Sequence, residues 1–288
     1  MGRKMLSKKM MAIKTLSKNI NILQCPICSS KLNIGEKNCL ICDNNHSFDI
    51  AKNGVILLHK KYKKVNDEIY TENLFLNRRK FINKGYYDEL HLCINEILKN
   101  QFNKNFNLLD LGSGDCTHLN YIKLNYANNV GIDLSYDAIK LATDYLNEDI
   151  LPICADLYNL PFKNNSFDAV IDILSPINSL EINRILKDDG IIIKVIPGKK
   201  YLYELRKILG FDLYEKEEEI INNLSKNFNI IYQKHLINVK PINEQTCKEL
   251  FSMTPLSNHK ELDSLKLDFI TIDLNVLVLN KKNKNIHN

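Results

Sequence analysis

The chain has 288 residues, of which 44% are hydrophobic and 25% are charged, and its formal net charge is +5 at pH 7. This composition can bury a core, and the length allows one doubly wound domain with a small appended module. Since no apolar run approaches the roughly 20 residues of a membrane helix and no secretory signal is visible, we expect a cytoplasmic protein that does not engage a membrane. The modest positive charge permits RNA binding without demonstrating it.

The chain begins with a basic segment. Residues 1–23 contain lysine and arginine but no acidic residue. Such a segment fits a disordered leader, an organellar presequence, or a stretch upstream of the true start, because Met10 and Met11 offer later start positions. We expect a disordered leader over residues 1–23 and a disordered tail over residues 281–288.

A cluster of candidate metal ligands follows, formed by Cys25, Cys28, Cys39, Cys42 and His46. A C-x2-C turn brings two thiolates to one tetrahedral ion, and a second knuckle supplies the other two ligands. The segment has too few apolar residues for an independent core, so zinc would supply its folding free energy. Spacing alone leaves two sets open, the first four cysteines or three cysteines with the histidine. Disulfides are the alternative, but a cytosolic context disfavours them.

We expect this zinc-binding module over residues 24–58, followed by a linker and helices over residues 59–105. The linker is basic from His59 to Lys64, and a second basic run spans 78–80. These cations can bind RNA phosphates, with Tyr62 available for stacking, or they can form a solvated connector.

The most informative motif is a glycine turn. An apolar run from Asn107 to Leu111 is followed by Gly112 and Gly114. Glycine lets the backbone pass close to a ligand at the carboxyl end of a strand before it enters a helix. The sequence therefore predicts a nucleoside cofactor at this turn.

Acidic residues follow the glycine turn at the spacing of a cofactor site. Asp133 ends a second expected strand, where its carboxylate can accept hydrogen bonds from both ribose hydroxyls. A dinucleotide fingerprint is the nearest alternative, but Thr117 stands where its third glycine belongs. Asp110 before the glycines and Asp156 after a third strand are similar to the residues that class I methyltransferases place around S-adenosylmethionine (SAM). We therefore favour SAM as the cofactor.

The remaining pattern alternates strands and helices, with expected strands near 107–111, 129–134, 151–154, 168–174, 190–196, 228–239 and 269–279. This indicates an α/β fold with a Rossmann-like doubly wound sheet, in which the last two strands form an antiparallel edge hairpin. We expect a class I SAM-dependent methyltransferase domain over residues 106–280. The scattered Cys93, Cys116, Cys154 and Cys247 are expected to be small buried side chains.

Several segments go beyond a generic methyltransferase. They are the H-x-F-D-x-A-K-x-G tail from His46 to Gly54, the stretch from Arg78 to Tyr87, the pair Pro197-Gly198, and the run from Met253 to Pro255. From about Leu23 to Leu279, the chain resembles the bacterial 23S rRNA (guanine-N1)-methyltransferases, which join an N-terminal zinc module to a class I SAM domain. The knuckle with its tail is the most specific element.

The resemblance also implies site residues. The family pattern of C-x2-C and C-x3-H implies the zinc ligands Cys25, Cys28, Cys42 and His46, and leaves Cys39 outside the site. Together with the glycine turn, it gives as expected SAM contacts Tyr87, Asp110, Gly112, Gly114, His118, Leu119, Asp133, Asp156, Leu157 and Tyr201. Two positions depart from the family, which usually has histidine where Tyr201 stands and glycine where Cys116 stands. A tyrosine hydroxyl can still donate a hydrogen bond.

The function that the resemblance implies is methylation of N1 of a guanine in a hairpin loop of 23S rRNA. Guanine N1 carries a proton that must leave as the bond forms, but we assign no catalytic base. Asp172, at the end of the fourth expected strand, is interpreted as a carboxylate that contacts solvent or backbone. Two alternatives are a class I methyltransferase acting on another RNA, a protein or a small molecule, and a non-catalytic RNA-binding assembly factor. Whether the chain forms a homodimer is left open.

Overall fold

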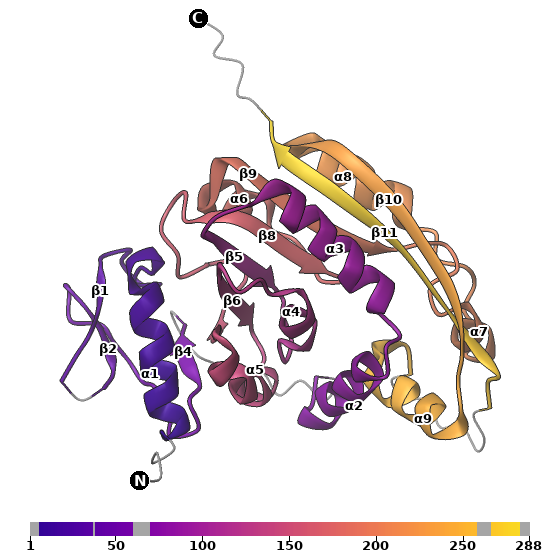
Figure 1. Cartoon of the computed structure of the whole chain (residues 1–288), viewed down its shortest axis with the longest axis horizontal. Coiled ribbons are helices and arrows are strands. Elements are labelled where there is room, and N and C mark those ends of the chain that lie inside the picture. Colours follow the sequence, from indigo (N-terminus) through magenta and orange to yellow (C-terminus); the bar gives the residue numbers. More distant parts are fainter. Residues whose placement is uncertain (1–5, 37, 60–69, 258–265, 283–288) are drawn as a thin grey trace, which may run out of the picture.

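The computed structural model describes residues 6–36, 38–59, 70–257 and 266–282. Its main sheet has eight strands in the order β10-β11-β9-β8-β5-β6-β7-β4 (Figure 1). The strands are β4 (Ile56–Leu58), β5 (Phe106–Leu111), β6 (Ala127–Asp133), β7 (Ile150–Ala155), β8 (Phe167–Ile173), β9 (Leu186–Pro197), β10 (Phe228–Pro241) and β11 (Phe269–Lys281). All neighbours pair in parallel except β11, which is antiparallel to both β9 and β10. The expected α/β class and antiparallel edge hairpin are confirmed.

The strand order creates the place for a ligand. β5 pairs with β6 on one side and with β8 on the other, so the chain changes direction across the sheet at β5. In doubly wound sheets, ligands bind at such a reversal, beyond the carboxyl ends of the strands. The turn that contains Gly112 and Gly114 leaves β5 at this point.

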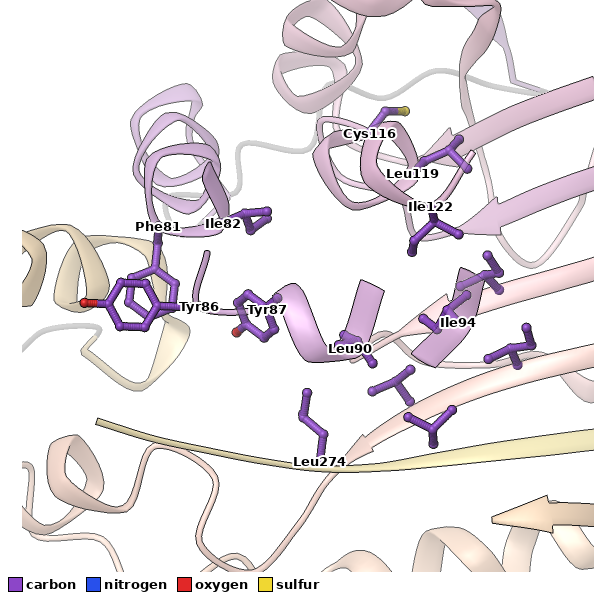
Figure 2. Packing of buried hydrophobic residues seen from close by; sticks show 14 of the residues in the cluster. Phe81, Ile82, Tyr86, Tyr87, Leu90, Ile94, Cys116, Leu119, Ile122 and Leu274 are labelled. Carbon is purple, nitrogen blue, oxygen red and sulfur yellow. The ribbon is translucent and has the colours of Figure 1, made fainter. Parts of the chain in front are cut away.

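Helices cover both faces of the sheet. They are α1 (Lys8–Asn19), α2 (Glu72–Asn83), α3 (Asp88–Gln101), α4 (Thr117–Ile122), α5 (Tyr136–Ala142), α6 (Ser179–Ile185), α7 (Tyr203–Ile208), α8 (Glu217–Asn227) and α9 (Glu244–Met253), with short 3-10 turns η1 (Ile20–Ile22), η2 (Thr143–Glu148) and η3 (Pro255–Ser257). Successive residues of a strand point to opposite faces, so Leu108 joins one core while Leu109 and Leu111 join the other. Figure 2 shows part of the first core, to which Leu119 and Ile122 of α4 and Leu90 and Ile94 of α3 all belong.

The module predicted over residues 24–58 contains a small sheet of its own. Its sheet consists of β1 (Leu32–Ile34), β2 (Leu40–Cys42) and β3 (Ser47–Phe48). The last strand of the predicted module, β4, also belongs to the main sheet, because it pairs in parallel with β7 as the edge strand. The three side chains of β4 are buried or nearly so, and this burial against the main sheet explains their placement.

The prediction of a disordered leader over residues 1–23 is wrong for most of that segment. Residues 8–19 form α1, which Ser7 caps by accepting a hydrogen bond from the Met10 backbone N–H. Its buried residues include Ala12 and Leu16, which lie one turn apart and pack in the second core. The basic side chains are partly neutralised, since Lys8 pairs with Asp144 of η2. At the other end of the chain, β11 runs to Lys281, while residues 283–288 lie outside the described residues.

Within the described ranges, no helix combines the length and the apolar character that a bilayer crossing requires. Cys93, Cys116, Cys154 and Cys247 are buried, as expected.

Candidate functional site

A cavity of about 1330 Å³ lies beyond the carboxyl ends of β5, β6 and β8. Its walls come from the glycine turn, from α2, α4 and α5, from Tyr87 just before α3, and from segments near α7 and η3. The cavity brings together these predicted SAM contacts: Tyr87, Gly112, Gly114, His118, Asp133, Leu157 and Tyr201. Residues that are up to 114 positions apart in sequence thus meet at one place.

The glycine turn forms the floor of the cavity. Gly112 has a φ of +70° and Gly114 has a φ of +55°, which is the left-handed region that glycine adopts freely. A Cβ on Gly112 would lie 2.6 Å from Oγ of Ser175, so no side chain fits there. The backbone is held from behind, because the N–H groups of Gly112 and Ser113 both donate to the Ile132 carbonyl at 2.9 Å. The turn is therefore a fixed cradle.

Asp133 faces the cavity at the tip of β6. Its Oδ2 accepts a hydrogen bond from the Gly114 N–H at 2.9 Å, and its Oδ1 accepts one from the Ser135 N–H at 2.8 Å. These bonds fix the carboxylate while leaving lone pairs on both oxygens for a ligand. Burial raises the pKa of Asp133, although the two backbone N–H groups oppose this shift. Such a carboxylate fits the ribose hydroxyls of a nucleoside.

Tyr87, Tyr201 and His118 line another part of the wall. The hydroxyl oxygens of Tyr87 and Tyr201 lie 2.7 Å apart, and the Tyr87 ring meets the His118 ring edge-on with centroids 5.0 Å apart. Burial raises the pKa of both tyrosines, so both hydroxyls stay protonated; one donates to the other, and the second remains free to donate to a ligand. The tyrosine that replaces the family's usual histidine therefore still reaches the cavity.

Three predicted SAM contacts do not line the cavity. Leu119 lies on α4 and is fully buried in the first core (Figure 2). Asp110 is 2% exposed and lies within β5, behind the turn. Asp156 is partly buried, and its Oδ1 accepts a hydrogen bond from the Tyr158 N–H at 2.8 Å. The motif spacing located the strand ends correctly but could not say which side chains turn inward.

Cys116 lies behind the glycine turn and is fully buried. Its φ of +60° lies in the left-handed region that glycine adopts most freely. The side chain fits because Gly131 on β6 leaves room for its sulfur. The thiol packs behind the cradle and is not part of the cavity wall.

Arg78 and Arg79, neighbours in the basic run at residues 78–80, contact different parts of the structure. Arg79 points away from the cavity and pairs with Asp115 at 2.6 Å and Asp144 at 2.9 Å, so it holds elements together and is not free for RNA. Arg78 lines the cavity, a role that the sequence reading missed. Phe75 and Ile82 of the same helix also line the cavity, but the basic run itself gave no signal of which cation faces it. The predicted phosphate-binding residues Lys60, Lys61, Tyr62, Lys63 and Lys64 lie outside the described residues.

Asp172 lies close to the cradle but is tied to other groups. Its Oδ1 is 2.6 Å from Nζ of Lys194, and the Ser175 hydroxyl donates to the same oxygen at 2.9 Å. Of the expected contacts with solvent or backbone, only the backbone contact is present, since the Ser175 N–H donates to Oδ1 at 3.3 Å. Asp172 is fully buried, and its main partner is a lysine on β9.

The metal ligands form a second centre in the N-terminal module. One ligand atom each from Cys25, Cys28, Cys42 and His46 lies within 4.8 Å of all the others. The Sγ atoms of Cys28 and Cys42 are 3.7 Å apart. A tetrahedral zinc ion with bonds of about 2.3 Å to sulfur requires separations of roughly 3.8 Å, so the set fits zinc.

The ligand chemistry agrees with this geometry. A hydrogen bond from the Ser30 hydroxyl lowers the pKa of Cys28 to about 5, which favours the thiolate that zinc binds. Cys39 is not in the cluster, and its Sγ lies 3.6 Å from the Cβ position of Gly35. Among the described residues, these three cysteines and one histidine are the group that could hold a zinc ion, and they are the set that the resemblance implied.

Comparisons with known proteins agree with both centres. Residues 23–64 match the zinc ribbon family described as "RlmA, N-terminal", and residues 109–194 match the family described as "Methyltransferase domain". YxjB of Bacillus subtilis, whose name assigns it to the 23S rRNA (guanine-N1)-methyltransferases, is 32% identical over 90% of this chain and 97% of its own length. The 23S rRNA (guanine(748)-N(1))-methyltransferase of Streptomyces fradiae is 24% identical over 85% of this chain and 89% of its own length.

The cofactor cradle, the three-cysteine, one-histidine centre and this nearly full-length similarity lead to one conclusion. The chain is a SAM-dependent methyltransferase with a zinc-binding module, and it belongs to the family of 23S rRNA (guanine-N1)-methyltransferases.

Proposed function

We propose that this enzyme transfers a methyl group from SAM to N1 of a guanine in a hairpin loop of 23S rRNA. The observation that carries the proposal is a cavity with two chemically different parts. Its volume of about 1330 Å³ exceeds the roughly 300–1,000 Å³ typical of single-ligand pockets. The part at the cradle suits a nucleoside cofactor, so room remains for a second molecule.

The second part of the cavity suits a nucleobase. Arg206 lies over the rings of Phe211 and Tyr214, with its guanidinium carbon 5.7 Å and 5.9 Å from their centroids, and all three residues line the cavity. Aromatic rings and an arginine plane are the surfaces on which unpaired bases stack. The N1 edge of guanine is hidden in a base pair, so a base that enters this part comes from a loop or is flipped out.

The surface around α7 supports contact with RNA outside the cavity. Phe211 is 39% exposed and Tyr203 is 36% exposed. Lys199, Lys200 and Lys207 are exposed beside them. Aromatic side chains interleaved with cations can stack bases and bind phosphates together. We propose that the RNA lies across this surface. The zinc module, next to the edge strand β4, would be a second RNA-binding surface.

The mechanism follows from these positions. Bound SAM supplies an activated methyl group on its sulfonium. Asp133 would hold the ribose and the cradle would position the cofactor, while the aromatic part would orient the base toward the methyl group. We assign no catalytic base, because Asp133 serves the ribose and Asp115 is paired with Arg79.

An assay with labelled SAM tests the proposal. The purified enzyme is incubated with a 23S rRNA hairpin transcript, with the same hairpin carrying adenosine in place of the target guanine, with transfer RNA, and with a protein mixture. We expect methyl transfer to the guanine hairpin alone. Transfer only to protein or to another RNA would support a different methyltransferase, and SAM binding without any transfer would support an assembly factor. A ribosomal substrate would place the enzyme in the cytoplasm.

A further inference from the structure

Arg78 brings a positive charge into the cofactor end of the cavity. Its Nη2 donates to the Met253 carbonyl at 3.2 Å, and its guanidinium carbon lies 5.5 Å from the centroid of Phe75. Its Nη1 lies 4.0 Å from the Cβ position of Gly114, so the charge is beside the cradle. Among the described residues, no carboxylate forms an ion pair with Arg78. A held, partly buried arginine of this kind is suited to an anion that a ligand brings.

His118 lines the same cavity and is held from behind by His91. Nε2 of His91 and Nδ1 of His118 lie 2.9 Å apart, so the ring nitrogen of His118 that remains for a ligand is Nε2. Burial lowers the pKa of His91 to about 4. Burial also lowers the pKa of His118 well below its usual value, and His91 and Arg78 add to this shift. Both rings are therefore neutral at pH 7, and each carries one N–H.

The surroundings of His91 decide where these protons lie. Nδ1 of His91 is buried without a hydrogen-bond partner. If that nitrogen carried the proton, a buried N–H donor would be left unpaired, which is the costlier arrangement. The proton of His91 therefore belongs on Nε2, from which it donates to Nδ1 of His118. His118 must then carry its own proton on Nε2 and present a donor to the cavity.

Besides the acceptor Asp133, the cofactor end thus offers hydrogen-bond donors: the Arg78 guanidinium, the His118 N–H and one hydroxyl of the hydrogen-bonded pair Tyr87 and Tyr201. The methionine part of SAM carries one anionic group, its carboxylate, while the ribose is assigned to Asp133. We infer that Arg78 and His118 bind the carboxylate of the cofactor's methionine, and that His91 is a positioning residue that keeps His118 a donor. This inference rests on SAM as the cofactor and not on the identity of the RNA.

An RNA phosphate is the other anion that Arg78 could meet. The structure favours the carboxylate because Arg78 lies against the cradle and near buried side chains, with Tyr87 only 3% exposed. The cations on the surface around α7 are exposed instead, as phosphate contacts require. Cofactor binding and RNA binding can be measured separately, so the two anions can be told apart.

Calorimetry with two ligands tests the role of Arg78. The ligands are S-adenosylhomocysteine and its analogue without the carboxylate. In Arg78→Gln, we expect roughly tenfold to a hundredfold weaker binding of S-adenosylhomocysteine, the scale of a charge-assisted hydrogen bond, and unchanged binding of the analogue. Arg78→Lys should lie between, since it keeps the charge without the planar fork. Lys80→Gln is the matched control, because this exposed residue lies on the same helix, and both affinities should stay at the parent value.

Two outcomes would overturn the assignment of Arg78. One is that Arg78→Gln and Arg78→Lys each weaken the binding of S-adenosylhomocysteine and of the analogue by the same factor, which would mean that the carboxylate is not involved. The other is unchanged binding of S-adenosylhomocysteine with weaker binding of hairpin RNA, which would make Arg78 a phosphate contact.

The role of His91 has a spectroscopic test. The ¹⁵N shifts of His118 in the parent should show the proton on Nε2. His91→Leu should give a mixture of tautomers and a reduced preference for S-adenosylhomocysteine over the analogue. His91→Gln should restore both properties, because its amide can donate to Nδ1 of His118. A proton on Nδ1 of His118 in the parent, or a parent-like preference in His91→Leu, would contradict the inference.

Discussion

Lys194 on β9 and Asp172 on β8 form an ion pair of 2.6 Å in which the side chains are only 5% and 0% exposed. Burial raises the pKa of Asp172, and the charge of Lys194 opposes that shift. Ser175 links this pair to the cofactor cradle, since its hydroxyl contacts both the Asp172 carboxylate and the Leu111 carbonyl at 2.9 Å. The pair therefore supports the end of β5 from below and is not a free acid or base.

Removing one partner of this pair should destabilise the fold. Lys194→Met leaves a buried carboxylate without its counter-charge, and we expect a loss of about 3–5 kcal/mol in the free energy of unfolding. Lys187→Met is the control, because its pair with Asp168 is 38% exposed at the lysine and should contribute only about 0–1 kcal/mol. Urea unfolding followed by circular dichroism measures both. Equal small losses would mean that the buried pair does not support the sheet.

Asp133 should matter for cofactor affinity. Asp133→Ala removes the carboxylate that faces the ribose, and we expect S-adenosylhomocysteine to bind more weakly by roughly 2–4 kcal/mol, the scale of two charge-assisted hydrogen bonds. Asp137→Ala tests a second aspartate that lines the cavity from α5, and it should change the affinity much less. Calorimetry measures both variants. Similar affinities for Asp133→Ala and the parent would remove Asp133 from the ribose site.

Cofactor binding should weaken in acid sooner than an ordinary aspartate would predict. The ionised Asp133 accepts the ribose hydroxyls, so affinity is complete at neutral pH and falls as the pH drops through its pKa. Because burial raises that pKa, the decline should begin above the usual aspartate value of about 3.9. Affinity measured over an acidic series should show this decline in the parent and not in Asp133→Asn. The same decline in both proteins would assign it to another group.

The zinc centre should depend on His46 and not on Cys39. Cys39→Ser should keep one zinc ion per chain, because Cys39 is outside the ligand cluster. His46→Ala should lose zinc to a chelator at concentrations that leave the parent intact, and the N-terminal module should unfold with it. Metal analysis after dialysis against the chelator measures both variants. Zinc retained by His46→Ala and lost by Cys39→Ser would establish a four-cysteine site instead.

The sequence predicted those parts of the structure that depend on local pattern. The strands that lead to Gly112 and Asp133 are apolar runs that end at motif residues, so the sequence predicted where they lie. The ligand set with His46 followed from the family resemblance, while spacing left Cys39 open.

Other features depend on contacts between distant residues. Lys194 lies 22 positions from Asp172, and Arg79 lies 36 positions from Asp115, so neither ion pair has a local signal. The helix at residues 8–19 was missed because its many lysines indicated a solvated segment, although Ala12 and Leu16 form a buried stripe. The sequence also could not predict that Leu119 faces the core and not the cavity, because this depends on how α4 packs.

Mass mapping of modified bases in 23S rRNA tests the central claim most directly. RNA from cells that lack this protein is compared with RNA from cells complemented by the parent chain or by the Asp133→Ala variant. We expect the parent to add one methyl group at N1 of a guanine in a hairpin loop, and the mutant to add little or none. If 23S rRNA carried the same guanine methylation in cells with and without the protein, the proposal that it methylates 23S rRNA would be contradicted.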